Sequence, residues 1–361
     1  MPRSCGRETV YMSKKRYLFY ISQNYSYAIL RPLQKIILAR GDEVRWFLMG
    51  DQVADKFLKS TEQRLLTIEE TIRWQPHAVF VPGNVVPSFI PGVKVAVFHG
   101  FDSGKVDSLG RSDHFNIRDC FDLYCTQGPE STKPFQRLAE KHGTFKVVET
   151  GWPTLDPLFK PDDSVITKRD DRPVILFCST FSPRFSCAEV VYDKVKQLSQ
   201  DSQWRWLVQF HPKMNRDIVE KYKKLDNDNL SFVETDDVLP LLKEADVMLC
   251  DTSSVLIMFL LQGKPVVTFN NKTNWPHLLN VNDVKGLEIA IEQALGRPPE
   301  LLDEIQRYCT RIHPNRDGCS SERVLAATDD LIDNGLVGLK RKPLNIFRNL
   351  KMRKILGYWK L

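Results

Sequence analysis

Short unbroken apolar runs alternate with longer amphipathic segments along most of this chain. The apolar runs of the first part are residues 16–22, 43–49, 78–83, 93–100, 121–128 and 145–151. Helical periods lie between some of them, as at 27–40 and 129–142. Strands that are apolar on both faces are typical of a parallel sheet covered by helices on each side. The first part is therefore predicted to be a parallel α/β domain.

The alternation pauses at residues 151–173, which are rich in Pro and Asp and show no amphipathic period. Such a stretch is typical of a domain boundary. The pattern then restarts, with predicted strands at 174–180, 205–212, 230–234, 246–250 and 265–269. Predicted helices follow at 187–199, 215–224, 237–244, 253–262, 283–294 and 299–311. We expect an α/β protein of two Rossmann-like domains facing a central cleft, with domains at 12–155 and 172–335.

The C-terminal segment 340–361 differs from the rest of the chain in charge. It carries eight Lys or Arg and no acid, so the chain's net +6 leaves −2 for everything else. Aliphatic and aromatic residues are interleaved with these cations, which is typical of a segment that lies on an anionic membrane. The expected contacts are Arg348, Lys351, Arg353, Lys354 and Trp359. A solvated tail is the alternative, and no fold motif supports nucleic-acid binding.

Other compositional features favour a cytoplasmic protein, peripheral on the inner face of the membrane. The N-terminus lacks the apolar region of a secretory signal, and the longest apolar run, Val255–Leu261, is far short of the roughly 20 residues of a spanning helix. The eight cysteines form no C-x-x-C pair, as expected of buried thiols in a reducing compartment. No metal-binding signature is present, and no cofactor is predicted.

Polar residues follow several predicted strands directly. His99 and Gly100 follow one strand of the first domain, and His211 follows a strand of the second. Arg184 lies in the loop after residues 174–180, and residues 251–254 follow the strand at 246–250. Ligands of open α/β sheets bind at the carboxyl ends of the strands. These residues are therefore the candidates for a site.

The stretch Asp251-Thr252-Ser253-Ser254 interrupts an apolar region just where a helix is expected to begin. Hydroxyl side chains and unpaired backbone N–H groups at a helix start bind anions, so a phosphate site is predicted. An ordinary helix cap is the alternative, and either strand-end histidine could be a core or turn residue. For the remaining histidines structural roles are expected, except His313, whose role the sequence leaves undecided.

Taken together, the motifs resemble the CDP-glycerol glycerophosphotransferase family, the teichoic-acid-type polyol-phosphate transferases of GT-B architecture. The order of five motifs carries the resemblance. They are FHG…GK…LG (98–110), TGWPTLDPLF (150–159), QFHP (209–212), the stretch 237–269 around DTSS, and DGCSSERV (317–324). The resemblance spans roughly residues 98–324 and implies a GT-B fold.

The resemblance implies roles for particular residues. His99 takes the position of the proposed catalytic base, and His211 that of a histidine at the nucleotide diphosphate. Diphosphate contacts are implied for Asp251, Ser253 and Ser254, and further contacts for the residues Asp317, Gly318, Ser320 and Ser321. The chain departs from the family at Thr252, where a tyrosine is usual, and Arg184 matches the family's arginine loop only loosely.

The implied reaction transfers a polyol phosphate, most simply glycerol phosphate, from a CDP-polyol to a hydroxyl of a glycan or lipid-linked acceptor, releasing CMP. Such chemistry requires positioning and charge stabilisation more than covalent catalysis. Two alternatives remain at this level. One is a GT-B glycosyltransferase or nucleotide-sugar 2-epimerase using a UDP-sugar, and the other is a non-catalytic membrane-associated partner in a polysaccharide assembly complex.

Overall fold

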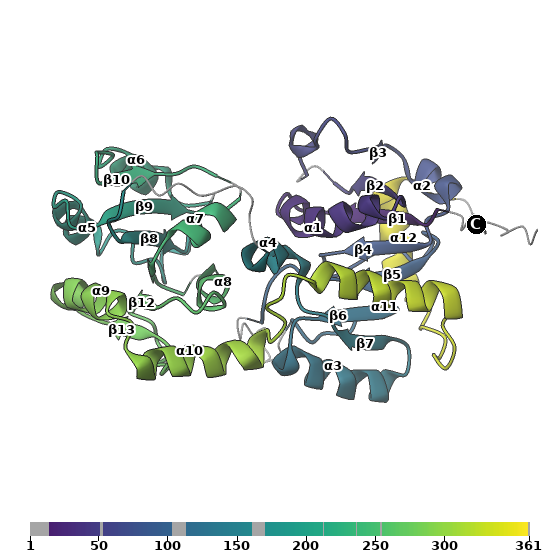
Figure 1. The fold of residues 1–361 in the computed structure, drawn as a ribbon. Coiled ribbons are helices and arrows are strands. Elements are labelled where there is room, and N and C mark those ends of the chain that lie inside the picture. The colour runs from purple at the N-terminus through teal and green to yellow at the C-terminus, as the bar shows by residue number, and fades with distance from the viewer. Residues whose placement is uncertain are drawn as a thin grey trace, which may run out of the picture.

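The structure is a computed structural model that describes residues 14–50, 53–102, 113–160, 170–211, 213–235, 237–252 and 255–359. It contains two parallel sheets, each covered by helices, in two lobes with the short helix α4 (Asp156–Phe159) between them (Figure 1). The expected architecture of two Rossmann-like domains is confirmed.

The first sheet has the strand order β3-β2-β1-β4-β5-β6-β7, and neighbouring strands are parallel. Its strands are β1 (Arg16–Ile21), β2 (Glu43–Leu48), β3 (Arg64–Leu65), β4 (Ala78–Val81), β5 (Val93–Ala96), β6 (Leu123–Thr126) and β7 (Lys146–Glu149). The order reverses between β1 and β4, which creates a topological switch point at the carboxyl ends of these strands. β1 is apolar on both faces because it lies in the middle of the sheet, where Tyr17–Ile21 are buried.

Three helices follow strands of this sheet: α1 (Ser26–Ala39), α2 (Ile68–Trp74) and α3 (Pro129–His142). α2 begins with a capping box, in which Thr67 accepts from Glu70 N and the Glu70 side chain accepts from Thr67 N. α3 has proline at its first position and ends at Gly143, whose φ of +71° suits glycine at a helix end. The predicted range of this helix is confirmed.

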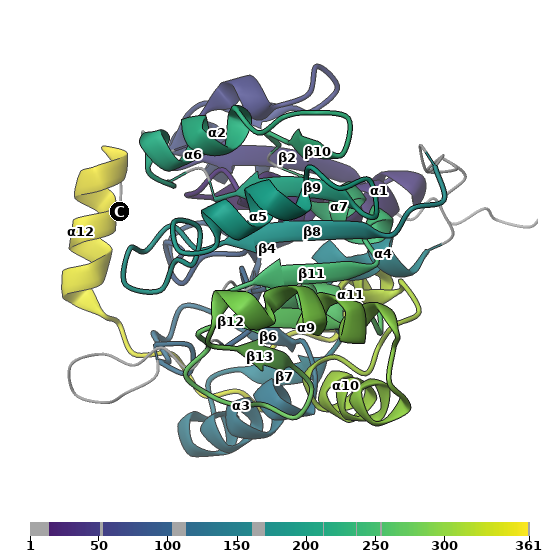
Figure 2. The ribbon, with the colours of Figure 1, turned by 90° about the vertical axis from the view of Figure 1, so that its left-hand side faces the viewer.

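The second sheet repeats the same topology, with the order β10-β9-β8-β11-β12-β13 and a switch point between β8 and β11. All its neighbouring pairs are parallel. Figure 2 shows α5, α6 and α9 on the near face of this sheet. Its strands are β8 (Val174–Ser179), β9 (Arg205–Phe210), β10 (Leu230–Phe232), β11 (Val247–Cys250), β12 (Val266–Phe269) and β13 (Leu279–Val281).

Two separate groups of helices pack on the two faces of the second sheet. One hydrophobic cluster joins the sheet to α5, α6 and α9, and another joins it to α7, α8 and α10. The helices are α5 (Tyr192–Leu198), α6 (Arg216–Lys223), α7 (Leu239–Glu244), α8 (Val255–Leu260), α9 (Leu287–Leu295) and α10 (Pro299–Ile312). Short 3₁₀ turns lie at Asp55–Phe57, Pro153–Leu155 and Val284–Gly286.

The chain crosses between the domains twice. It leaves the first domain near α4 and returns after α10 into α11 (Ser320–Asn334), which packs against α1 and β5. Val324 and Leu325 are buried in the same cluster as residues of β1 and α8, so one continuous core spans both domains. The range 172–335 predicted for the second domain thus contains a helix that lies on the first.

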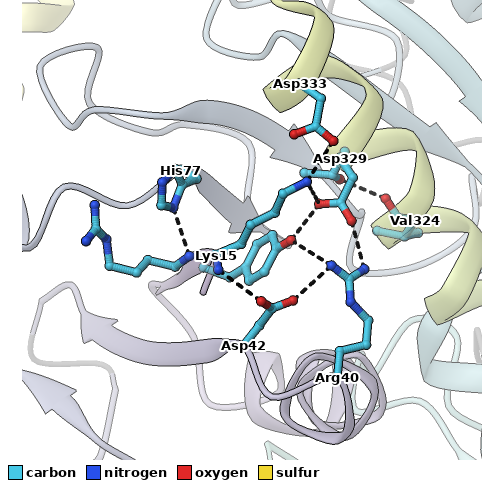
Figure 3. Close-up of polar contacts among 10 residues, drawn as sticks. Lys15, Arg40, Asp42, His77, Val324, Asp329 and Asp333 are labelled. Atoms are coloured by element: carbon cyan, nitrogen blue, oxygen red, sulfur yellow. Dashed lines mark hydrogen bonds and ion pairs between the residues drawn. The ribbon is translucent and has the colours of Figure 1, made fainter. Parts of the chain in front are cut away.

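A polar network fixes α11 to the start of the first sheet (Figure 3). Asp329 on α11 accepts hydrogen bonds from the Tyr17 hydroxyl at 2.5 Å and the Arg40 guanidinium at 2.7 Å. Lys15 pairs with Asp329 at 3.4 Å and with Asp333 at 2.9 Å. Burial and the neighbouring Asp329 raise the pKa of Tyr17, so its hydroxyl stays protonated and donates. The network therefore ties the second crossover to the first domain.

The C-terminal segment forms helix α12 (Ile346–Leu356), docked on the first domain. Met352 is buried, the Tyr358 ring stacks on Phe89 at 5.2 Å between centroids, and the Arg353 guanidinium lies 4.7 Å from the centre of the same Phe89 ring. Lys342 forms an ion pair with Asp122. Within the described residues, no helix is long and apolar enough to cross a membrane.

Candidate functional site

The switch point of the second sheet brings together the loops that follow β8, β9 and β11. Thr252 is exposed directly after β11, at the edge where α8 begins. The predicted phosphate contacts Ser253 and Ser254 lie outside the described residues. Arg184 is exposed in the loop after β8 and His211 is exposed after β9. Three of the predicted positions therefore lie at neighbouring strand ends.

Asp251 differs from its neighbours because its side chain points into the protein and is 1% exposed. Its carboxylate accepts from the Ser179 hydroxyl at 2.6 Å, from Thr180 N at 3.0 Å and from Cys187 N at 3.1 Å. These donors lie at the two ends of the loop after β8. The sequence suggested a substrate contact, but the geometry supports a residue that holds this loop in place.

The ring of His211 has a fixed orientation. Lys213 N donates to His211 Nδ1 at 3.1 Å, so the neutral ring carries its proton on Nε2. The Phe181 ring lies 4.6 Å from the imidazole, centroid to centroid. Burial and, secondarily, the charge of Lys213 lower the pKa of His211. A neutral His211 therefore presents an N–H donor at the sheet edge.

His99 lies at the carboxyl edge of the first sheet, and its neutral tautomer is opposite to that of His211. Its Nδ1 lies 3.1 Å from the carbonyl oxygen of Pro82, which can only accept. The proton is therefore on Nδ1, and the neutral ring keeps a lone pair on Nε2. The Tyr25 ring stacks on His99 at 5.7 Å and is 47% exposed. Sequence reasoning missed Tyr25, although it too follows a strand at the switch point.

The backbone beside His99 is strained. Phe98 has φ +57°, an unusual conformation for a bulky residue. Its side chain packs on Tyr124 and Phe135 in the core, while its carbonyl accepts from the Trp152 indole at 3.4 Å. Gly100 follows, with its carbonyl bonded to the Gln127 amide at 2.8 Å and open space where a Cβ would be. Such local strain is characteristic of functional positions.

The motif at 317–321 lies at the start of α11, away from the second sheet's edge. Ser320 and Ser321 are each 1% exposed, and their backbone N–H groups donate to the two carboxylate oxygens of Asp156, both at 2.8 Å. The anion at this helix start is thus a side chain of the protein. Gly318 has φ +71°, and a Cβ there would lie 2.6 Å from Lys160 Cγ, so glycine is required.

The same region joins the two crossovers. Trp152 N donates to His313 Nε2 at 2.8 Å, and Arg323 pairs with Asp317 while its guanidinium reaches Thr150 O at 3.4 Å. A Cβ on Gly151 would lie 2.5 Å from Ser320 Oγ. Two of the motifs that carried the resemblance therefore pack together as the junction between domains, and His313 belongs to it.

The described contacts thus sort the predicted residues into three groups. His99 and Gly100 stand at the first sheet, His211, Arg184 and Thr252 stand at the second, and the residues of 317–321 stand at the junction. No group of three or more His, Cys, Asp or Glu able to hold a metal ion occurs among the residues that the structure describes.

A cavity of about 710 Å³ lies elsewhere, between α4 and the loop that follows α8. Two of its lysines already have partners. Lys264 Nζ donates to three backbone carbonyls at the C-terminal end of α7, those of Leu242, Lys243 and Ala245. Lys160 pairs with Glu322 at 3.0 Å. The cavity lies at the C-terminal end of α8, whereas Thr252 precedes the N-terminal end of this helix. We therefore place the candidate site at the strand ends rather than in this cavity.

The fold matches that of known GT-B proteins. One structure of the wall teichoic acid polymerase TagF has a TM-score of 0.64 and 14% identity, covering 89% of this chain and 90% of that one. A putative UDP-N-acetylglucosamine 2-epimerase from Listeria monocytogenes has a TM-score of 0.61 and 13% identity, covering 89% of this chain and 98% of that one. At such identities the likeness establishes the fold alone. The protein is a two-domain α/β protein of the GT-B class.

Residues 102–274 match the family model of CDP-glycerol:poly(glycerophosphate) glycerophosphotransferase. The resemblance found in the motifs is thereby confirmed over a segment that carries Arg184, His211 and Asp251, and over this segment the chain is similar to CDP-glycerol glycerophosphotransferases. His99 lies just before the matched segment, and residues 317–321 lie after it. No curated protein matches the chain.

Proposed function

We propose that the protein transfers a polyol phosphate, most simply glycerol phosphate, from a CDP-polyol to an acceptor hydroxyl in the synthesis of a teichoic-acid-like polymer. The opposite tautomers of the two strand-end histidines are the observation that carries this proposal. His99 offers a lone pair and His211 offers an N–H, which are the groups that a proton acceptor and a phosphate-binding donor require.

The chemistry follows from these two rings. The acceptor hydroxyl loses its proton to His99 Nε2 as its oxygen attacks the phosphorus that carries the polyol. The bond from this phosphorus to the bridging oxygen breaks, and CMP leaves with that oxygen. His211 Nε2–H donates to the diphosphate as negative charge develops on the leaving phosphate. The polyol phosphate ends as a phosphodiester on the acceptor.

Two further findings support the choice of donor. A TagF structure obtained after a soak with CDPG has a TM-score of 0.62 and 14% identity, covering 89% of both chains. The family match covers the edge of the second sheet where the donor would bind. Glycan or lipid-linked hydroxyls are the proposed acceptors.

The test is CMP release by the purified protein with CDP-glycerol, CDP-ribitol or a UDP-sugar, in the presence of a lipid-extract acceptor. CMP should be released from one CDP-polyol, and His99→Ala should slow release by about 10²–10⁴-fold because the general base is lost. His142→Ala, at the C-terminal end of α3, is the matched control and should release CMP at close to the native rate.

Other results would exclude the proposal. Undiminished release by a folded His99→Ala variant would remove His99 from the mechanism. UDP release would instead favour the alternative raised by the epimerase-like fold, a UDP-sugar enzyme. Nucleotide binding without release of either product, across all acceptors, would favour the non-catalytic partner.

We also propose that α12 holds the protein on an anionic membrane surface, where a lipid-linked acceptor would lie. The helix uses one side for docking, through Met352 and Arg353, and leaves the other to solvent. On that outer side Phe347 is 90% exposed, together with Lys351 and Lys354. Exposed rings beside lysines are typical of segments that lie in the headgroup region. Arg348 instead donates to Arg118 O, so it contributes to docking.

A further inference from the structure

Two cations at the edge of the second sheet share one aromatic ring. The Arg184 guanidinium lies 5.5 Å from the centre of the Phe185 ring, and Lys272 Nζ lies 5.3 Å from it. Arg184 follows β8 and Lys272 follows β12, the strands on either side of β11. The pair therefore spans the sheet edge where β11 ends and Thr252 stands. The sequence pattern singled out neither Phe185 nor Lys272.

This pair lacks an acidic partner in the described part of the chain. Neither Arg184 nor Lys272 forms an ion pair there, although both are exposed and Phe185 is 40% exposed. Lys213, 5.9 Å from the centre of the Phe181 ring beside His211, is likewise without an ion pair. Each ring attracts the cation beside it, but the like charges repel one another, and a bound anion would relieve that repulsion.

The loops that carry the pair are held rigidly. Asp251 binds both ends of the loop after β8, and the Ser179 and Ser186 hydroxyls are 2.9 Å apart. The loop after β12 is closed by Asn280, whose side chain accepts from Asn271 N at 3.0 Å and donates to Asn271 O at 3.0 Å. Binding groups placed in advance lose little entropy when a ligand arrives. The backbone that carries the pair is thus held in place before a ligand arrives.

We propose that Arg184 and Lys272, supported by Phe185, bind the terminal phosphate of a nucleoside diphosphate group. This phosphate is the one that carries the polyol in the donor, while the His211 N–H is placed for the neighbouring phosphate. The inference rests on the proposed function for the identity of the nucleotide, though not for the phosphate contact itself. Phe185 is a positioning residue, because it fixes the two cations without adding charge.

The experiment compares the affinities of CDP and CMP, which differ only in the terminal phosphate. Isothermal titration of each nucleotide into the native protein and into Lys272→Ala gives the two dissociation constants. The CDP constant should rise about tenfold or more, since a hydrogen bond to a charged group is lost, while the CMP constant stays within about twofold. Lys285→Ala removes an exposed lysine of the same domain and is the matched control.

Phe185→Leu tests the supporting ring. It keeps an apolar side chain and all charges, so a selective loss of CDP affinity would show that the ring positions the cations. Arg184→Lys should also weaken CDP, because lysine lacks the planar guanidinium that can stack on the ring and bind two phosphate oxygens. Thermal unfolding of each variant establishes that the fold is retained.

Two outcomes would overturn the inference. Unchanged CDP affinity in Lys272→Ala and in Phe185→Leu would remove the anion site. An equal loss for CDP and CMP would assign the pair to another part of the nucleotide. A third outcome would separate the two proposals. If the native protein binds UDP and UMP instead, and Lys272→Ala weakens the binding of UDP but not of UMP, the phosphate site is supported and the proposed CDP-polyol donor is wrong.

Discussion

At the scale of single residues, two buried carboxylates each hold a distant stretch of backbone in place. Asp251 accepts from both ends of the loop that carries Arg184, and Asp156 accepts from the first N–H groups of α11. Both are almost fully buried. A buried carboxylate is tolerated when donors surround it, so its burial indicates an organising role.

Replacing Asp251 by alanine should lower the free energy of unfolding by about 3 kcal/mol, because two backbone N–H groups and a hydroxyl would be left buried without an acceptor. Urea unfolding measures this loss. The same variant should weaken CDP binding, because the loop is no longer held. Asp283→Ala removes an exposed cap in the same domain and should cost about 1 kcal/mol. A loss for Asp251→Ala no larger than this control would contradict the assigned role.

At the scale of elements, the junction between the crossovers depends on a neutral histidine. His313 is fully buried and accepts a hydrogen bond from Trp152 N, and its surroundings contain Arg316, Arg323 and Asp317. Burial is the main reason that the pKa of His313 is lowered to about 4. Since an unfolded histidine has a pKa of about 6.5, the unfolded chain binds the proton more readily.

The junction should therefore weaken in acid. The contribution of His313 to stability is fully present above about pH 6.5 and is lost as the pH falls toward 4, with a total of about 3 kcal/mol. His277 is buried with its pKa lowered to about 4 as well, and it should add to this trend. Urea unfolding at pH 7, 5 and 4 should show a shallower pH dependence in His313→Gln than in the native protein. An identical slope would rule out this role for His313.

At the scale of the whole molecule, the C-terminal segments belong to the first domain. α11 crosses back to it, and α12 docks on it beside Phe89. The docking of α12 divides the cations of the tail into two sets, one that contacts the protein and one that is exposed. Arg348 and Arg353 face the protein, while Lys351, Lys354 and Trp359 remain exposed. A membrane contact would therefore depend on the exposed members alone.

Reversal of the charge at Lys351 and Lys354 by glutamate should release the protein from anionic vesicles. Each lysine near such a surface contributes about 1 kcal/mol, so loss of two should weaken partitioning by about 30-fold or more. Co-sedimentation with vesicles containing phosphatidylserine measures this. The control reverses Lys196 and Lys285, two exposed lysines of the second domain, and should bind as the native protein does. Equal binding by both double variants would refute the membrane role of α12.

The limits of prediction at this scale are seen in particular elements. The strands β3 and β13 escaped prediction because each has only two or three residues and lies at a sheet edge, where no apolar run is needed. Helix α11 was not predicted, and its residues were assigned to the second domain because they follow that domain directly along the chain. Helix α3 and most central strands were predicted because local periodicity encodes them.

Local sequence patterns were enough to predict the two parallel α/β units and to place His99, His211 and Arg184 at strand ends. They were enough because strand and helix periods, and the residues that follow each strand, are local properties. The partners of each side chain could be known from the folded structure alone. Asp156 binds Ser320 from 164 positions away, and Lys272 reaches Phe185 from another loop. Such partners depend on how distant elements pack, and that packing separates the residues that can bind a ligand from those that hold the site together.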